Sequence, residues 1–245
     1  MNTFLSEVRE TVFAHRDSTF GPLPPLLLGL TVVTGLVDSF SYLVLGHVFV
    51  ANMTGNVVFL AFALVGAPGF SIPASLTALG AFGLGALIGG RVCSTLAKHR
   101  ARLLSTCTMI QAFFMTVSVV LAGLSGTTAT AGFRYGLIVV LGVSMGIQNA
   151  AARKLAVPDL TTTVLTMTIT GISADGPIAG RTGAKAGRRG LTVVAMFLGA
   201  VVGALLIVHA QTVYPLAIAL VMVGSVSGVT RVLGASDPAW SEVQG

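Results

Sequence analysis

Residues 24–45 read PPLLLGLTVVTGLVDSFSYLVL, an apolar run of 22 residues interrupted by one acidic side chain, Asp38. An α-helix needs about 20 apolar residues to cross the hydrocarbon core of a bilayer. Five more stretches of this kind follow, at residues 74–97, 103–124, 131–152, 191–210 and 213–233. The sequence therefore predicts an all-α polytopic membrane protein with about six transmembrane helices.

The composition agrees with a membrane protein. Of the 245 residues, 54% are apolar and only 9% are charged, and the mean hydropathy is +0.91. Soluble domains carry about 25% charged residues. The net charge of +6 comes from short basic clusters between the apolar runs, which is the arrangement of cytoplasmic loops. We therefore expect the lipid bilayer as a partner and no nucleic acid.

The basic clusters predict the orientation of the chain, because Lys and Arg accumulate in cytoplasmic loops. The clusters are Arg9 and Arg16; Lys98, Arg100 and Arg102; Arg153 and Lys154; and Arg181, Lys185, Arg188 and Arg189. Placing all of them inside makes both termini cytoplasmic. Residues 1–20 and 234–245 are then cytoplasmic segments that flank a single membrane domain at 21–233.

Two apolar stretches, residues 54–65 and 161–172, are too short to cross as straight helices. The basic clusters stay inside only if the helices on either side of residues 54–65 both reach the outside. We therefore predict that residues 54–65 form a re-entrant half-helix from the outside, and residues 161–172 one from the cytoplasmic side. Pro158 favours an extended approach to the second segment.

The two halves of the chain resemble each other at an offset of 107 residues, at which residues 29–35 fall on residues 136–142. Repeat one is placed at 24–97 and repeat two at 131–210. The first begins inside and the second outside, so we predict inverted repeats, which in many transporters build a site at the membrane midplane. At this offset Asp38 lies opposite Met145, and a chance match of Gly/Val-rich helices is the alternative.

Asp38 lies past the middle of its predicted helix, well inside the hydrocarbon. An acidic side chain at this depth is costly, and it indicates a functional site by default. We expect Asp38 to contact a polar solute or to carry a coupling proton. The alternative is a structural hydrogen bond to a neighbouring helix.

Polar residues open both short segments. Such side chains cap free N–H groups at helix starts, and two half-helix N-termini that meet at depth would bind an anion or a polar group. Capping alone explains the pattern equally well. The candidate solute-binding residues are Asn52, Thr54, Gly55 and Asn56 in the first segment and Asp159, Thr161, Thr162 and Thr163 in the second.

Other polar residues have two interpretations. Gln148 and Asn149 either face the same site or form interhelical hydrogen bonds. Arg91 and Arg134 lie near helix ends, where snorkelling to the interface explains them. A pH-sensing role for His47 and His209 is less favoured than a wet interfacial position.

Enzyme motifs are absent from the sequence. It contains no His-Glu-x-x-His helix, no phosphate-binding loop and no Gly-x-Ser-x-Gly turn. Cys93 and Cys107 have neither a disulfide framework nor metal-ligand spacing. We therefore predict no enzymatic activity, no catalytic residue, no metal and no cofactor.

Four sequence blocks carry a family resemblance: GLVD at 35–38, VFVANMTGN at 48–56, GIQNAA at 146–151 and VPDLTTTVL at 157–165. In this order they resemble the YoaK-like family of bacterial membrane proteins of unknown function, over roughly residues 24–233. The resemblance implies about six membrane segments in a bacterial cytoplasmic membrane. It implies no particular activity or substrate.

These features together predict a secondary transporter or exporter of a small polar or anionic solute, with Asp38 as the candidate proton-coupling residue. A passive channel is the first alternative, since opposed half-helices also build pores. A membrane scaffold or sensor that transports nothing and uses the basic loop is the second. Six crossings are also compatible with a homodimer.

Overall fold

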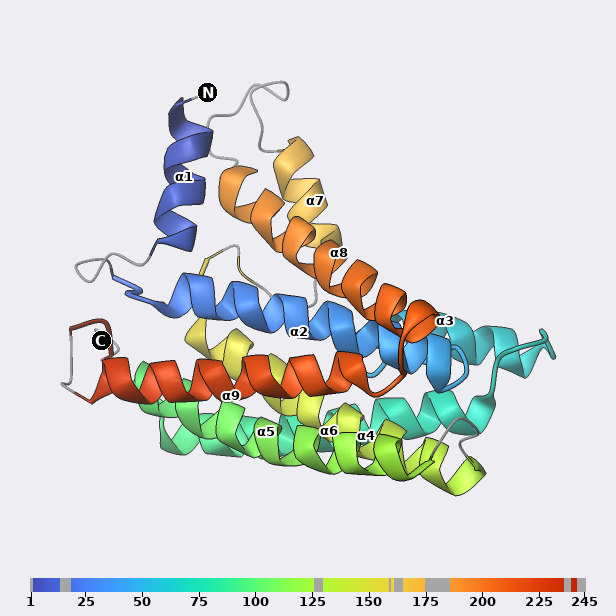
Figure 1. The fold of residues 1–245 in the computed structure, drawn as a ribbon. Helices are drawn as coiled ribbons and strands as arrows, with labels where there is room; N and C mark the ends of the chain where they lie inside the picture. The colour runs from blue at the N-terminus through green and yellow to red at the C-terminus, as the bar shows by residue number, and fades with distance from the viewer. Residues whose placement is uncertain are drawn as a thin grey trace.

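The chain is seen in a computed structural model, which describes residues 2–13, 19–125, 130–158, 160, 165–174, 186–235 and 239–241. Every element in this part of the chain is a helix (Figure 1). Six of the described helices are long and apolar enough to cross a membrane, which confirms the six predicted segments. They are α2 (Leu23–Val44), α4 (Ile72–Thr95), α5 (Arg100–Ser125), α6 (Ala131–Leu155), α8 (Ala186–His209) and α9 (Tyr214–Gly234).

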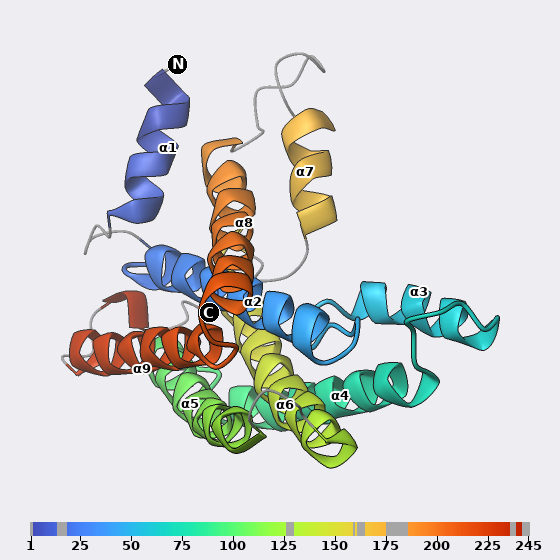
Figure 2. The same cartoon turned by 45° about the vertical axis from the view of Figure 1, so that its right-hand side comes forward.

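The shorter elements are α1 (Asn2–Val12), α3 (Met53–Leu64), α7 (Leu165–Ala174) and a 3₁₀ turn, η2 (Ala239–Ser241). Helix α3 coincides with the predicted short segment at 54–65. Helix α7 covers the later part of the predicted segment at 161–172, whose first four residues lie outside the described chain. In Figures 1 and 2, α7 lies beside α8, and α3 lies at the far end of α2 from α1.

Local sequence explains where several long helices begin and end. Prolines occupy the first turns of α2, α4 and α9, where no intrahelical N–H bond is lost. The Ser71 side chain caps α4 by accepting the N–H of Ala74. Helix α6 ends at Ala156, which has a left-handed φ of 47°.

Glycines set the two closest helix crossings, α8 on α2 and α4 on α6 (Figure 2). A Cβ added at Gly35 of α2 would overlap the carbonyl of Met196 in α8, and one at Gly146 of α6 would overlap the carbonyl of Phe82 in α4. Only glycine lets the backbones approach this closely, which is how helices pack where lipid removes the hydrophobic driving force.

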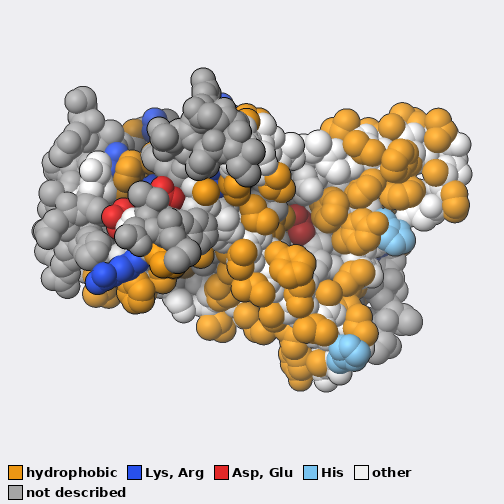
Figure 3. Space-filling model, turned by 90° about the horizontal axis from the view of Figure 1, so that it is seen from above, with side chains coloured by type: hydrophobic (Ala, Val, Ile, Leu, Met, Phe, Trp, Pro, Cys, Tyr) orange, Lys and Arg blue, Asp and Glu red, His pale blue; other side chains and the backbone are white. Residues whose placement is uncertain are grey.

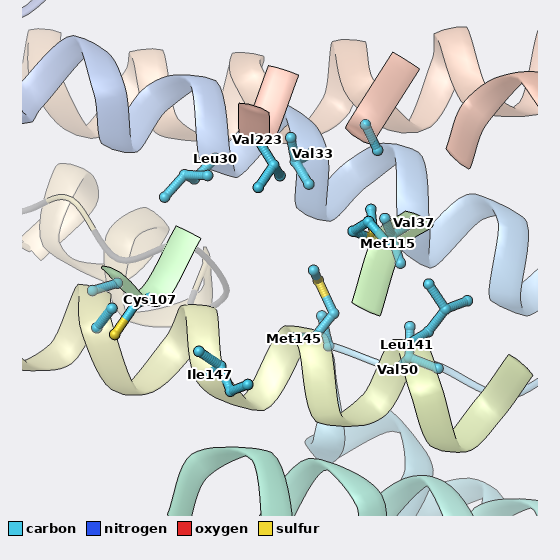
Figure 4. Close-up of a cluster of buried hydrophobic side chains, with 14 of the residues drawn as sticks. Leu30, Val33, Val37, Val50, Cys107, Met115, Leu141, Met145, Ile147 and Val223 are labelled. Atoms are coloured by element: carbon cyan, nitrogen blue, oxygen red, sulfur yellow. The ribbon is translucent and has the colours of Figure 1, made fainter. Parts of the chain in front are cut away.

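The core lies between α2 and α6, which are the most buried spans among the described helices. Figure 4 shows side chains from both helices pointing toward one another, with further side chains from α5, α9 and the segment before α3 closing the space. The labelled residues are Leu30, Val33, Val37, Val50, Cys107, Met115, Leu141, Met145, Ile147 and Val223.

One end of the bundle is basic. Helices α2 and α5 begin there and α4, α6 and α9 end there, so Lys98, Arg102 and Arg231 lie at this end. The described part of the C-terminal tail packs there too, because Trp240 covers Gly21 just before α2. On the face in Figure 3, Lys and Arg side chains gather at the left, histidines lie at the right, and hydrophobic side chains cover much of the surface between them.

Candidate functional site

The candidate site is built where the chain leaves α2. Gly46 and His47 have left-handed φ angles of 83° and 57° and reverse the chain direction. The following residues return along α2 until the N–H groups of Val50 and Ala51 reach Asp38. Asp38 precedes the end of α2 by six residues, or about 9 Å of helix. Helix α3 therefore begins inside the bundle rather than at its end.

The same segment leaves at the end where it entered. The His47 Nδ1 atom lies 3.0 Å from the carbonyl oxygen of Gly69, after α3. Aromatic rings fill the space between: Phe59 of α3 stacks on Phe49 and on Phe70, with centroids 5.5 Å and 5.2 Å apart. This is the geometry expected of a re-entrant segment.

Asp38 is 4% exposed, and its two carboxylate oxygens differ. The Oδ1 atom accepts the N–H of Ala51 at 3.0 Å and that of Val50 at 3.3 Å. The Oδ2 atom is buried and has no hydrogen-bond partner in the described part of the chain. A buried polar atom without a partner costs free energy, so Oδ2 is suited to bind a proton or a donor group that enters the site.

Asn56 and Gly55 support the segment and are not open to a solute in this conformation. The Asn56 side chain is fully buried; its Nδ2 donates to the Phe49 carbonyl at 2.6 Å, and its Oδ1 accepts the Phe49 N–H at 2.9 Å. A Cβ at Gly55 would overlap the ring of Phe49. Both residues therefore hold the extended approach against α3.

Asn52 and Thr54 stand at the start of α3. Asn52 occupies the N-cap position but makes no side-chain cap hydrogen bond, so the capping expected of it is not seen. The Thr54 side chain is exposed. Because the first-turn N–H groups of a helix have no intrahelical partner, those of α3 remain open to another acceptor close to Asp38.

Gln148 lies in a buried hydrogen-bond network that joins three helices. Its Nε2 donates to Thr34 Oγ1 at 2.9 Å and to the Leu30 carbonyl at 3.2 Å in α2, and its Oε1 accepts from Gln111 Nε2 of α5 at 2.7 Å. Of the two interpretations, Gln148 thus fits the interhelical hydrogen bond. Asn149 is half-buried and donates to the Met145 carbonyl at 2.9 Å.

Sequence reasoning missed Gln111 and Thr34. Gln111 is the single amide in the apolar run at 103–124, and a polar side chain inside a membrane span is a signal that could have found it. The Oε1 atom of Gln111 and the hydroxyl of Ser144 are buried without a partner in the described chain. Polar groups therefore extend from Asp38 into the centre of the bundle.

Two other expectations have different outcomes. Arg134 is not explained by snorkelling, since its Nε donates to the Leu45 carbonyl at 2.6 Å and closes the end of α2. Asp159, Thr161, Thr162 and Thr163 lie outside the described residues, so the second half of the predicted site is not placed.

Comparisons with known proteins agree with the membrane fold. The sequence profile of the family described as "Protein of unknown function (DUF1275)" matches residues 26–229, from α2 to α9. The UPF0700 transmembrane protein YoaK of Bacillus subtilis (strain 168) is 38% identical over 160 residues, which cover 64% of this chain and 67% of the relative. No solved structure matches the chain. The chain is therefore a multi-pass membrane protein that belongs to the DUF1275 family, to which YoaK is similar.

Proposed function

We propose that the protein is a secondary transporter of a small polar or anionic solute, and that the solute or its coupling proton binds at Asp38. The observation that carries this proposal is the division of labour within one carboxyl group. Oδ1 holds the turn into α3, while Oδ2 is buried and unpartnered. Intramembrane carboxyl groups of this kind serve proton relays and substrate pathways.

The neighbourhood of Asp38 supplies donors as well as an acceptor. Helix α3 begins two residues after Ala51, and its N-terminus carries the positive end of the helix dipole together with uncapped N–H groups. An acceptor beside open donors suits a solute that carries both kinds of group, or an anion that enters with a proton.

The proposal includes an inverted repeat, which the glycine crossings support. A Cβ at Gly35 would overlap the carbonyl of Met196 and the amide nitrogen of Ala200; a Cβ at Gly146 would overlap the same two atoms of Phe82 and Ala86. These residue pairs are related by an offset of 111 residues between α2 and α6, and of 114 residues between α4 and α8.

The reverse contacts follow the same offsets. A Cβ at Gly199 would meet the backbone of Val32, and one at Gly85 would meet the backbone of Val143. Each half of the chain thus packs its glycine-rich helix on the central helix of the other half. A chance likeness between apolar helices does not account for matched atoms at both crossings.

The offset of 111 changes the pairing of Asp38. At the offset of 107, which differs by about one helical turn, Asp38 falls on Met145; at 111 it falls on Asn149, and the block GLVD falls on GIQN. Each half then carries a polar side chain at this position. One is a titratable carboxyl and the other a neutral amide, which suits a transporter with one proton-binding site.

Flux measurements on proteoliposomes test the proposal. Wild type, Asp38→Asn and a matched control, Thr108→Val, are compared for uptake of amino acids, amines, organic anions and inorganic anions under an imposed proton gradient. Thr108 is a buried hydroxyl of α5 that donates within its own helix. We expect wild type and the control to accumulate one solute class, and Asp38→Asn to exchange that solute without accumulating it.

The alternatives give different results. A channel would pass solute downhill with or without Asp38 and would never accumulate it. A scaffold or sensor would show no flux in any of the three proteins. Either outcome would contradict the proposal.

A further inference from the structure

A second polar site lies at the basic end of the bundle, between the start of α5 and the end of α9. It is a pocket of about 350 Å³, at the small end of the range for ligand sites. Two arginines and three hydroxyl side chains contribute to its wall. The lining residues are Leu96, Ala101, Arg102, Ser105, Thr106, Thr230, Arg231, Gly234 and Ala235.

The helix pair holds this pocket in shape. Helices α5 and α9 run in opposite directions, so the first turn of one lies beside the last turn of the other. Gly234 lets Ala101 approach closely, because a Cβ at Gly234 would overlap the Ala101 side chain. The Ser227 hydroxyl donates to the Ser105 carbonyl at 3.1 Å. The pocket is thus formed by two packed helices and not by a loop.

The charge in the pocket is positive and uncompensated within the described chain. The guanidinium groups of Arg102 and Arg231 form no hydrogen bond or ion pair there, whereas Arg100 donates to the Thr19 carbonyl and lies over the ring of Phe20. None of the described acidic residues lines the pocket. The opposed dipoles of the two helix ends offset each other, so the arginines set the sign.

We propose that this pocket binds a phosphate group, bridged by Arg102 and Arg231. The planar guanidinium fork matches phosphate oxygens in a bidentate manner, and the Thr106 hydroxyl, which has no partner in the described residues, is placed to donate a third hydrogen bond. The ligand is a phosphate ester, either the head group of an anionic phospholipid or a soluble phosphorylated compound. This site is separate from Asp38 and does not depend on the proposed transport.

Lipid retention and thermal stability test the proposal. Delipidated full-length protein is titrated with phosphatidylglycerol or phosphatidylcholine and examined by native mass spectrometry. In a parallel series, inorganic phosphate is compared with chloride at equal ionic strength by thermal unfolding. The variants are R102Q/R231Q, R102K/R231K and the matched control R91Q, which removes an exposed arginine of α4 outside the pocket.

We expect phosphatidylglycerol to bind wild type and R91Q, and to bind R102Q/R231Q about tenfold more weakly. R102K/R231K should fall between them, since lysine keeps the charge without the fork. Stabilisation by inorganic phosphate without selective lipid retention would identify a soluble ligand. Equal binding by wild type and R102Q/R231Q in both series, or an equal loss in R91Q, would overturn the proposal.

Discussion

The carboxylate of Asp38 accepts the backbone N–H of Ala51 at 3.0 Å, thirteen residues further along the chain. A side chain within the first membrane span thereby determines where the chain stops returning and begins α3. The N–H of Val50 shares the same oxygen at 3.3 Å, so one acceptor satisfies two buried donors.

Replacing Asp38 should separate this structural role from any role in transport. Asp38→Ala leaves two N–H groups without an acceptor, and we expect it to lower the free energy of unfolding by about 1–3 kcal/mol for each of them. Asp38→Asn keeps an oxygen at the Oδ1 position and should be much closer to wild type. Thermal unfolding in detergent micelles measures both; equal losses in the two variants would show that this oxygen does not hold the turn.

The glycine crossings predict matched effects in the two halves. Gly85→Ala and Gly199→Ala both push a methyl group into a facing backbone, and we expect each to destabilise the protein by about 1–3 kcal/mol. Gly83→Ala, two residues from Gly85 on α4, faces open space and should be neutral or slightly stabilising, because alanine favours helix. The recovery of monodisperse protein and its unfolding temperature are the measurements. An unequal cost at Gly85 and Gly199 would count against equivalent crossings.

The Gln111–Gln148 pair should show coupling. Gln148→Leu removes the acceptor for Gln111 and the donor to Thr34, so each single Leu variant strands a buried polar group. The double variant strands fewer groups than the two single changes together, and we expect a coupling energy of about 0.5–2 kcal/mol in a double-mutant cycle. Additive losses would indicate that the hydrogen bond contributes nothing.

The course of residues 47–69 predicts which loops face the same side. In a background that lacks Cys93 and Cys107, Pro68→Cys should react with an impermeant thiol reagent from outside intact cells, and Lys98→Cys should react only after lysis. Both positions are exposed. Protection of Pro68→Cys in intact cells would mean that the segment crosses the membrane, and the charge-based orientation would be wrong.

Several features of the candidate site were predictable from particular residues. A lone carboxyl in the run at 24–45 marked Asp38, and polar residues before a short apolar stretch marked the start of α3. The roles within that segment were not predictable. Asn56 was expected to line a site and instead binds the Phe49 backbone, because the extended approach needs a partner for its own polar groups. Arg134 was expected at the interface and instead closes α2.

The sequence by itself determined the membrane class, the six spans and the position of the short helix α3, because each depends on local length and hydropathy alone. The tertiary structure decided which polar groups meet and how the two halves align. Apolar helices rich in Gly and Val match each other at several offsets one turn apart, so sequence likeness selected 107. Only the contact of a glycine with a facing backbone distinguishes one turn from the next, and it pairs Asp38 with Asn149.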